Sequence, residues 1–175
     1  VERSANRTVQ LVDRIRSFIR PAQGDYEDVD MKVLVHDVQH LLSHDIRANN
    51  VQFEWDFDDS ACLVHGDKIQ LSQIVLNVYR NAIQAMAGGD DKRISVSLAR
   101  EDERVVLHVL DSGAGLDEVV KDHVGQPFVT TKREDMGVGL SISKTIAQMH
   151  SGSLSIANAV GGGALVELNL PALQR

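Results

Sequence analysis

The sequence predicts an α/β fold in which a mixed sheet of about five longer strands is covered on one face by three helices, giving a two-layer sandwich. Two patterns lead to this prediction. Short segments that are apolar throughout, or that alternate apolar and polar residues, are typical of strands. Three longer segments, near 31–46, 68–87 and 138–150, repeat apolar residues every three or four positions, as helices with one buried face do. A sheet and helices that each have an apolar face bury those faces against each other.

The chain opens with a helical stripe that ends at Pro21. Its apolar residues repeat at helical spacing among arginines: Val9, Leu11, Val12, Ile15, Phe18 and Ile19. The residue before a proline is disfavoured in a helix, so the helix is expected to end there. A single stripe has nowhere to bury its apolar face. An N-terminal helix that packs outside the sandwich is therefore expected, as in a fragment that begins within a longer helical unit.

A second helix is expected from about residue 31 to 46, and it carries His36, His40 and His44 on one face. A metal site, a phosphoacceptor and a solvated helix face are the three interpretations of this row. Asp37 follows His36, as an acidic residue does in phosphoacceptor motifs. No further ligand type and no downstream proline accompany the histidines, which favours the solvated face.

A strand at 51–57 alternates aromatic with polar residues and places Trp55 in the core.

The next helix, 67–86, carries Asn77 and Asn81 one turn apart. Its apolar face contains Leu71, Ile74, Val75, Val78, Ala82, Ile83 and Ala85. Amide oxygens at this spacing could converge on one cation or polar ligand. They could instead cap neighbouring backbone, because buried polar groups usually have a structural partner.

Strands at 94–98 and 105–110 follow a Gly-Gly helix stop. The second is apolar throughout, which indicates a buried strand, and it ends at Asp111 in the sequence DSGAGL. Gly113 and Gly115 let the backbone turn sharply and approach a ligand closely. A carboxylate in this position either accepts a hydrogen bond from a ligand or caps the following turn.

Two further motifs precede the last helix. PFVTTK covers 127–132, and GVGLS at 137–141 opens the apolar run of the helix at 138–150. Glycines at a helix start present free backbone amides and the positive end of the helix dipole to an anion. The chain then closes with a hairpin of strands at 154–157 and 164–170 that turns across three consecutive glycines.

Composition excludes several classes of protein. A chain of 175 residues with 43% hydrophobic residues supports one sizeable core and an appendage. The net charge of −7 argues against a nucleic-acid partner, which needs a basic surface. The one cysteine, Cys62, excludes an internal disulfide and fits a reducing, cytoplasmic compartment. No apolar run reaches membrane-spanning length, so no direct membrane contact is expected, although a longer parent could be membrane-anchored.

The four motifs, in this order, resemble those of the catalytic, ATP-binding domain of two-component sensor histidine kinases. That domain belongs to the ATPase superfamily that includes gyrase, MutL and heat-shock chaperones. The helix with Asn77 and Asn81 is similar to the asparagine box, DSGAGL to the first glycine box, PFVTTK to the phenylalanine box and GVGLSIS to the second glycine box. The resemblance covers 28–173 and implies the Bergerat-type ATP-binding fold.

The resemblance implies a site for ATP and Mg²⁺ built on these motifs. Asn81 would coordinate the metal with help from Asn77, since amide oxygens are hard neutral ligands. Asp111 would accept a hydrogen bond from the adenine amine, and Lys132 and Arg80 would meet the phosphates. Hydrolysing members of the superfamily carry a glutamate one turn before the metal asparagine. An amide at Asn77 cannot act as a base, which favours phosphoryl transfer over hydrolysis.

The segment 116–136 resembles the ATP lid of the family, with Phe128 as its apolar anchor and Gly125 and Gly137 as hinges. The residues expected to line the nucleotide come from all four motifs: Asn77, Arg80, Asn81, Asp111, Gly113, Gly115, Leu116, Phe128, Thr130, Thr131, Lys132, Gly137, Val138, Gly139 and Leu140.

By resemblance, 1–21 are the C-terminal part of the dimerisation and phosphotransfer hairpin, and 22–175 are the catalytic domain of a protein histidine kinase. The implied partners are a second copy of the parent, joined through the hairpin, and the receiver domain of a response regulator. The acceptor histidine is expected outside this chain, which should therefore not phosphorylate itself. Three alternatives stay open: a hydrolase of the superfamily, an anti-sigma-factor-type serine kinase, and a nucleotide-binding module without turnover.

Overall fold

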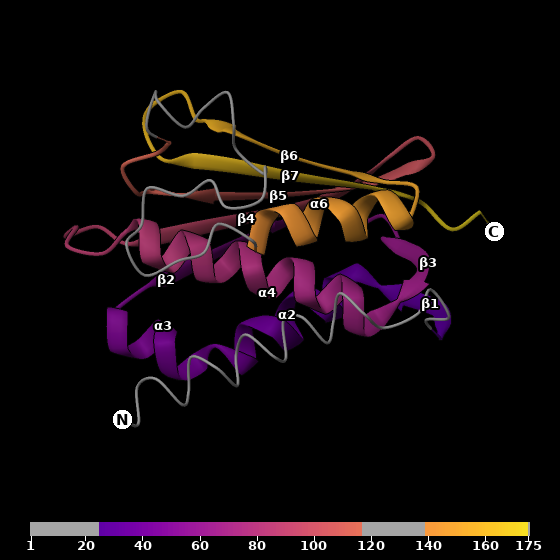
Figure 1. The fold of residues 1–175 in the computed structure, drawn as a ribbon, viewed down its shortest axis with the longest axis horizontal. Helices are drawn as coiled ribbons and strands as arrows, with labels where there is room; N and C mark the ends of the chain where they lie inside the picture. Colours follow the sequence, from indigo (N-terminus) through magenta and orange to yellow (C-terminus); the bar gives the residue numbers. More distant parts are fainter. Residues whose placement is uncertain (1–24, 117–138, 175) are drawn as a thin grey trace.

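The computed structural model describes residues 25–116 and 139–174 (Figure 1). The helices in this part are α2 (Met31–Leu41), α3 (Ser43–Asn49), α4 (Lys68–Ala85) and α6 (Gly139–Met149). The strands are β1 (Tyr26–Asp30), β2 (Gln52–Phe57), β3 (Leu63–Asp67), β4 (Arg93–Glu101), β5 (Arg104–Asp111), β6 (Ser153–Asn158) and β7 (Ala164–Pro171). The N-terminal helix expected at 1–21 and most of the expected lid lie outside the described residues.

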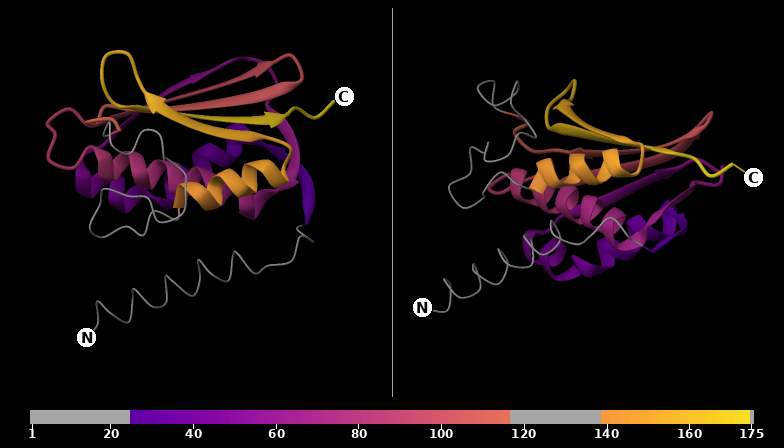
Figure 2. Two further views of the ribbon diagram at one scale, coloured as in Figure 1. Left: turned by 45° about the horizontal axis from the view of Figure 1, so that its top comes forward. Right: turned by 45° about the vertical axis from the view of Figure 1, so that its right-hand side comes forward.

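The main sheet has five strands in the order β2-β4-β5-β7-β6. β2 pairs with β4 in parallel, and the other three pairs are antiparallel, so the sheet is mixed. The helices lie together on one face of this sheet, with α4 and α6 side by side (Figures 1 and 2). The two-layer α/β sandwich expected from the sequence is confirmed.

A second sheet, formed by β1 and β3 alone, was not predicted. Neither segment carries a strand pattern: β1 buries only Val29, and β3 contains His65 and Gly66. The two segments pair antiparallel, with Tyr26 opposite Asp67 at the end that leads into α4. Such a short ribbon forms because its neighbours hold it, and its own side chains give little signal.

The helix expected at 31–46 is wrong as one element, because it divides into α2 and α3 at Leu42. The backbone there departs from helical geometry (φ −92°, ψ 9°). The amide of Leu42 is shared between the carbonyls of Val38 and Gln39, which tightens the end of α2. Leu42 and Ile46 are both buried, so the break keeps both halves in contact with the core.

Trp55 and its aromatic neighbours on β2 are half-buried, because β2 is an edge strand. The expectation that Trp55 packs on the core is confirmed, but the side chain is only partly enclosed. The His36 ring lies 4.1 Å from the Trp55 ring and 5.3 Å from the Phe57 ring, between centroids. His36 therefore belongs to an aromatic cluster and not to a solvated face, whereas His40 and His44 are exposed.

The helix α4 forms the centre of the core, as its apolar pattern predicts. Its buried side chains are Leu71, Ile74, Val75, Val78, Tyr79, Ala82 and Ile83. Ala85 is only half-buried, and Tyr79, which is fully buried, was not among the expected core residues. Asp67 caps the helix start by accepting hydrogen bonds from the amides of Ile69 (2.8 Å) and Gln70 (3.1 Å).

Candidate functional site

The two asparagines of α4 differ in what holds them. The Asn77 amide nitrogen donates to the Gly139 carbonyl (3.2 Å) and to the Ser143 hydroxyl (3.2 Å). A carbonyl can only accept, so the atom that faces Gly139 must be the amide nitrogen. Asn81, one turn on, is half-buried, and its carboxamide makes no hydrogen bond to any other described residue. The expectation that these amides cap neighbouring backbone thus holds for the amide nitrogen of Asn77.

The side-chain oxygens of Asn77 and Asn81 are suitable ligands for a hard cation. With its nitrogen directed at α6, Asn77 presents its carboxamide oxygen as an acceptor, and Asn81 adds a second amide one turn away. Mg²⁺ accepts such neutral oxygens together with phosphate oxygens and waters. Across 25–116 and 139–174, no three His, Cys, Asp or Glu side chains gather where they could hold a metal. A cation at this place would therefore depend on amide and phosphate oxygens.

Asp111 ends β5 as a buried carboxylate, 5% exposed. Its Oδ1 accepts hydrogen bonds from the Gly113 amide (2.8 Å) and from the Ala164 amide (3.3 Å). Asp111 therefore does cap the following turn, and it also ties β5 to the start of β7. A carboxylate offers about four acceptor positions, so these bonds are compatible with a further one to an adenine amine. The adenine contact itself stays a prediction.

The glycines around Asp111 are required by the protein's own backbone. A Cβ on Gly113 would lie 2.7 Å from the Ala85 carbonyl oxygen, so the turn after β5 packs directly on the end of α4. Gly115 has a φ of +78°, which confirms the expected sharp turn. A Cβ on Gly163, which has a φ of +83°, would lie 1.8 Å from the Asp111 carbonyl oxygen. The sequence predicted a turn at Gly163 but not this close approach.

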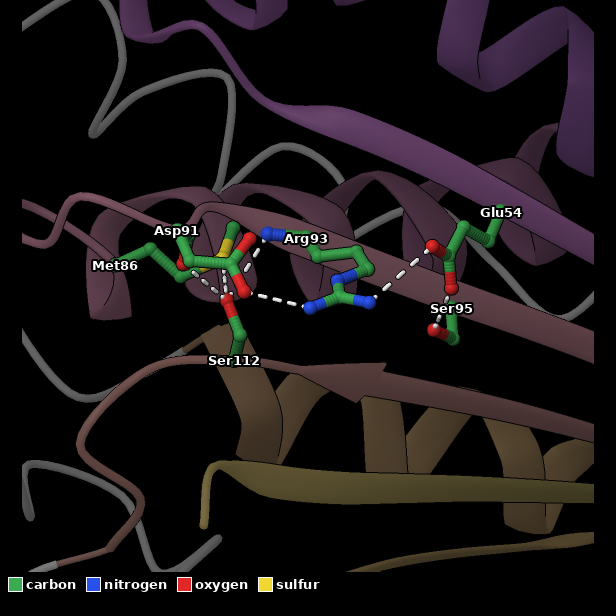
Figure 3. A network of polar contacts seen from close by, with 6 residues as sticks. All are labelled: Glu54, Met86, Asp91, Arg93, Ser95 and Ser112. Atoms are coloured by element: carbon green, nitrogen blue, oxygen red, sulfur yellow. Dashed lines mark hydrogen bonds and ion pairs between the residues drawn. The ribbon is translucent and has the colours of Figure 1, made fainter.

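Ser112 fastens the same turn to the end of α4, and sequence reasoning missed it (Figure 3). Its hydroxyl donates to the Asp91 carbonyl (2.7 Å), accepts from the Arg93 amide (2.9 Å) and lies 3.3 Å from the Met86 sulfur. The Arg93 guanidinium in turn contacts Asp91 (2.6 Å) and Glu54 (3.5 Å), and the hydrogen bond that it donates to the Asp91 carboxylate raises the pKa of Arg93. This network joins α4, β4 and the Asp111 turn.

Asn158 holds the other side of the glycine motif. Its side chain accepts from the Leu116 amide (2.5 Å) and donates to the Leu116 carbonyl (3.1 Å). These two bonds fix Leu116, the last described residue of the motif, to the end of β6. No sequence pattern marked Asn158, because its partner lies 42 positions away in the chain.

The structure brings the asparagine helix against two of the glycine motifs. Gly139 begins α6 beside Asn77, and Leu140 follows it as a half-buried residue packed on the core. At the C-terminal end of α4, Ala85 contacts Gly113. Arg80 is exposed on α4. The remaining expected site residues lie outside the described residues: Phe128, Thr130, Thr131, Lys132, Gly137 and Val138.

The comparison with protein families matches residues 66–174 to the family described as histidine kinase-, DNA gyrase B- and HSP90-like ATPase. The chain is 32% identical over 169 residues to the sensor protein FixL of Bradyrhizobium diazoefficiens, a match that covers 96% of this chain and 34% of FixL. It is 30% identical to the sensor histidine kinase ZraS of Escherichia coli K12. The chain spans about a third of the length of these curated relatives.

Solved structures agree with this match. The catalytic domain of the histidine kinase ThkA superposes with a TM-score of 0.76 at 27% identity, covering 85% of this chain and 96% of that domain. ThkA in complex with the response regulator protein TrrA gives a TM-score of 0.80 at 24% identity and covers 98% of this chain and 49% of ThkA, which shows the same fold. Along 25–116 and 139–174, no helix is both long enough and apolar enough to cross a membrane.

Proposed function

The chain belongs to the histidine kinase-, DNA gyrase B- and HSP90-like ATPase family, and from this premise we propose that 22–175 form the catalytic, ATP-binding domain of a sensor histidine kinase. The parent protein transfers the γ-phosphoryl group of ATP to a histidine on its dimerisation hairpin, of which 1–21 are the C-terminal part. The observation that carries this proposal is Asn77, an amide one turn before Asn81 whose nitrogen is held by the start of α6.

Each motif has a role in this proposal. ATP lies between α4 and the segment that leads into α6. Asn81 holds Mg²⁺ with support from the oxygen of Asn77, and Asp111 accepts from the adenine amine. Lys132 and Arg80 supply positive charge to the phosphates. The bound metal neutralises negative charge on the phosphate oxygens.

The reaction depends on positioning and on charge neutralisation, because phosphoryl transfer needs little covalent chemistry from the protein. An amide at Asn77 cannot remove a proton from water, which removes the usual route to hydrolysis. The base that acts on the acceptor histidine belongs to the hairpin and lies outside this chain.

The proposed partners follow from the same reaction. A second copy of the parent pairs through the hairpin, and the receiver domain of a response regulator takes the phosphoryl group from the histidine. ThkA has the same fold as this chain, and its solved complex with the response regulator protein TrrA supports the second partner. We place the domain in the cytoplasm, where ATP is available and the buried, unpaired Cys62 stays reduced.

The metal assignment is tested by calorimetric titration of the chain with ATP, with Mg²⁺ and with EDTA. Asn81→Ala should weaken binding in Mg²⁺ and abolish most of the difference between the two conditions, because a metal ligand is lost. Asn49→Ala is the control, since the Asn49 amide only donates to the Asp45 carbonyl within α3. Equal affinity of the wild type and Asn81→Ala for ATP in Mg²⁺ would remove Asn81 from the metal site.

A further inference from the structure

His150 is a buried side chain, 6% exposed, that joins α6 to the start of α4. Its Nε2 lies 3.0 Å from the backbone nitrogen of Asp67, and its Nδ1 lies 2.8 Å from the carbonyl oxygen of Ile146. The Asp67 amide can only donate, so Nε2 is the acceptor. The Ile146 carbonyl can only accept, so Nδ1 carries the hydrogen. Both ring nitrogens are therefore used, and only the Nε2 bond crosses from one helix to the other.

The imidazole fits its place closely. A Cβ on Gly66 would lie 2.6 Å from Cδ2 of His150, so only glycine leaves room for the ring. On another side the Tyr26 ring stacks on it, with centroids 5.1 Å apart and planes inclined by 16°. The Tyr26 hydroxyl also donates to the Met149 carbonyl (3.4 Å). The ribbon of β1 and β3 thus encloses the ring, and β3 supplies its hydrogen-bond donor.

The contact lies at the opposite end of α6 from the nucleotide motifs. Near its first residue, α6 is held by Asn77 through Gly139 and Ser143. Immediately after its last residue, it is held by His150 through Asp67. The helix has eleven residues, so these contacts are separated by about 16 Å along its axis. Two contacts this far apart define both the axial position and the tilt of α6 against α4 (Figures 1 and 2).

We propose that His150 is a positioning residue for the nucleotide site. Its bond to Asp67 sets the register of α6 against α4, and so determines where Gly139 and Leu140 stand relative to Asn77 and Asn81. The role of that register in ATP binding rests on the proposed function. A buried histidine with a purely structural role would lower stability when replaced, but it would leave the start of α6 and the affinity of the folded protein unchanged.

Two replacements separate these roles. In His150→Gln the side-chain oxygen can reach the position of Nε2 and accept from Asp67, so the bond between the helices is kept. In His150→Asn the side chain ends near the position of Nδ1, so that bond is lost. His65→Gln is the matched control: this second histidine also contacts Tyr26 but is exposed on β3 and pairs with Asp28. Val35→Ala, in the core of α2, controls for lost stability alone.

The experiment measures the affinity of each variant for a fluorescent ATP analogue in Mg²⁺, with urea unfolding as the record of stability. His150→Asn should bind about threefold to tenfold more weakly than wild type, the factor expected for one lost buried hydrogen bond. His150→Gln should recover most of this loss, and His65→Gln and Val35→Ala should bind as wild type does. Equal affinities of the Asn and Gln variants, or an equal loss in Val35→Ala, would overturn the proposal.

Amide hydrogen exchange gives a second readout that does not need ATP. His150→Asn should accelerate exchange at 143–145, two turns from the substitution, and His150→Gln and His65→Gln should not. Unchanged exchange there would overturn the positioning role even if the wild type binds ATP. If the wild type binds no ATP but exchange in His150→Asn is altered as expected, the proposed function is contradicted. The inference that His150 sets the register of α6 against α4 would then still hold.

Discussion

At the scale of single residues, the site depends on which atoms are already used by the fold. Asn77 gives its nitrogen to α6 and keeps its oxygen as an acceptor. Asp111 gives Oδ1 to two backbone amides. A substitution at such a residue tests two roles at once, so the informative replacements are those that preserve the contact within the fold and change only the contact with the ligand.

Asp111→Asn is such a replacement, because its remaining oxygen can still accept from Gly113 and Ala164. Replacing one acceptor by a donor should weaken adenine binding by about 1–3 kcal/mol, with little change in the free energy of unfolding. Calorimetric titration with ATP and urea unfolding measure the two quantities. A variant that loses stability but binds ATP normally once folded would show that Asp111 acts only as a turn cap.

Tyr79 gives a prediction about stability. Its hydroxyl is fully buried in α4 and has no hydrogen-bond partner among the described residues, while its ring packs edge-on against Phe53. Tyr79→Phe should therefore leave the free energy of unfolding unchanged or raise it by up to about 1 kcal/mol. A fall of more than about 1 kcal/mol in urea would mean that a buried partner, such as an ordered water, satisfies the hydroxyl.

The same side chain predicts a dependence on alkaline pH. Burial raises the pKa of the Tyr79 phenol above its ordinary value of 10.0. Because the pKa of this phenol is higher in the folded state than in the unfolded state, its contribution to stability is fully present below about pH 10. That contribution is lost as the pH rises through the folded-state pKa. The wild type should therefore lose stability more steeply than Tyr79→Phe above about pH 10. Parallel stability curves for the two proteins up to pH 11 would contradict this account.

At the scale of elements, the turns around Asp111 are where the fold and the site meet. The turn after β5 packs on the end of α4 through Gly113, and the hairpin between β6 and β7 packs on Asp111 through Gly163. Ser112 adds hydrogen bonds to Asp91 and Arg93, where the loop after α4 enters β4. The position of the Asp111 carboxylate is thus defined by three elements that are distant in sequence.

Gly163→Ala should destabilise the protein by about 3 kcal/mol, because its Cβ would overlap Asp111 at a positive φ. Gly161→Ala, in the same turn, is the matched control. Its φ is also positive, +106°, but a Cβ there would meet nothing within 4 Å, so the cost should be about 1 kcal/mol. Urea unfolding compares the two, and equal costs would show that strain alone, and not the contact with Asp111, requires the glycine.

Sequence patterns predicted the elements that bury one face, and they missed those that depend on neighbours. The five strands of the main sheet and the helix α4 each carry a clear apolar pattern, whether alternating, continuous or at helical spacing, and all were found. The ribbon of β1 and β3 has no such pattern, because the pairing of its two segments defines it, and the apolar spacing of 31–46 does not mark the break at Leu42. Ser112, Asn158 and His150 were missed for the same reason: their partners are distant backbone groups.

At the scale of the whole molecule, the motifs that are separate in sequence converge on α4. Asn77 meets the start of α6 in its middle, Ala85 meets the Asp111 turn at its end, and Asp67 meets His150 at its beginning. The order of the motifs led to the correct fold, since the resemblance to a family carries information about the whole arrangement, and the nucleotide site that it implies stays a prediction. It could not predict the contacts that hold the arrangement in register, which depend on atomic fit.

The central claim is that this domain passes the γ-phosphoryl group of ATP to a histidine on a separate hairpin. The most direct test is incubation of the chain with γ-labelled ATP, Mg²⁺ and a separately supplied dimerisation hairpin of the same protein. A hairpin without its histidine is the control. Acid-labile label should appear on the hairpin alone, and slowly, because the tether that raises the effective concentration is absent. Release of inorganic phosphate without labelled hairpin, or acid-labile label on the chain itself that is lost in His36→Ala, would contradict the claim.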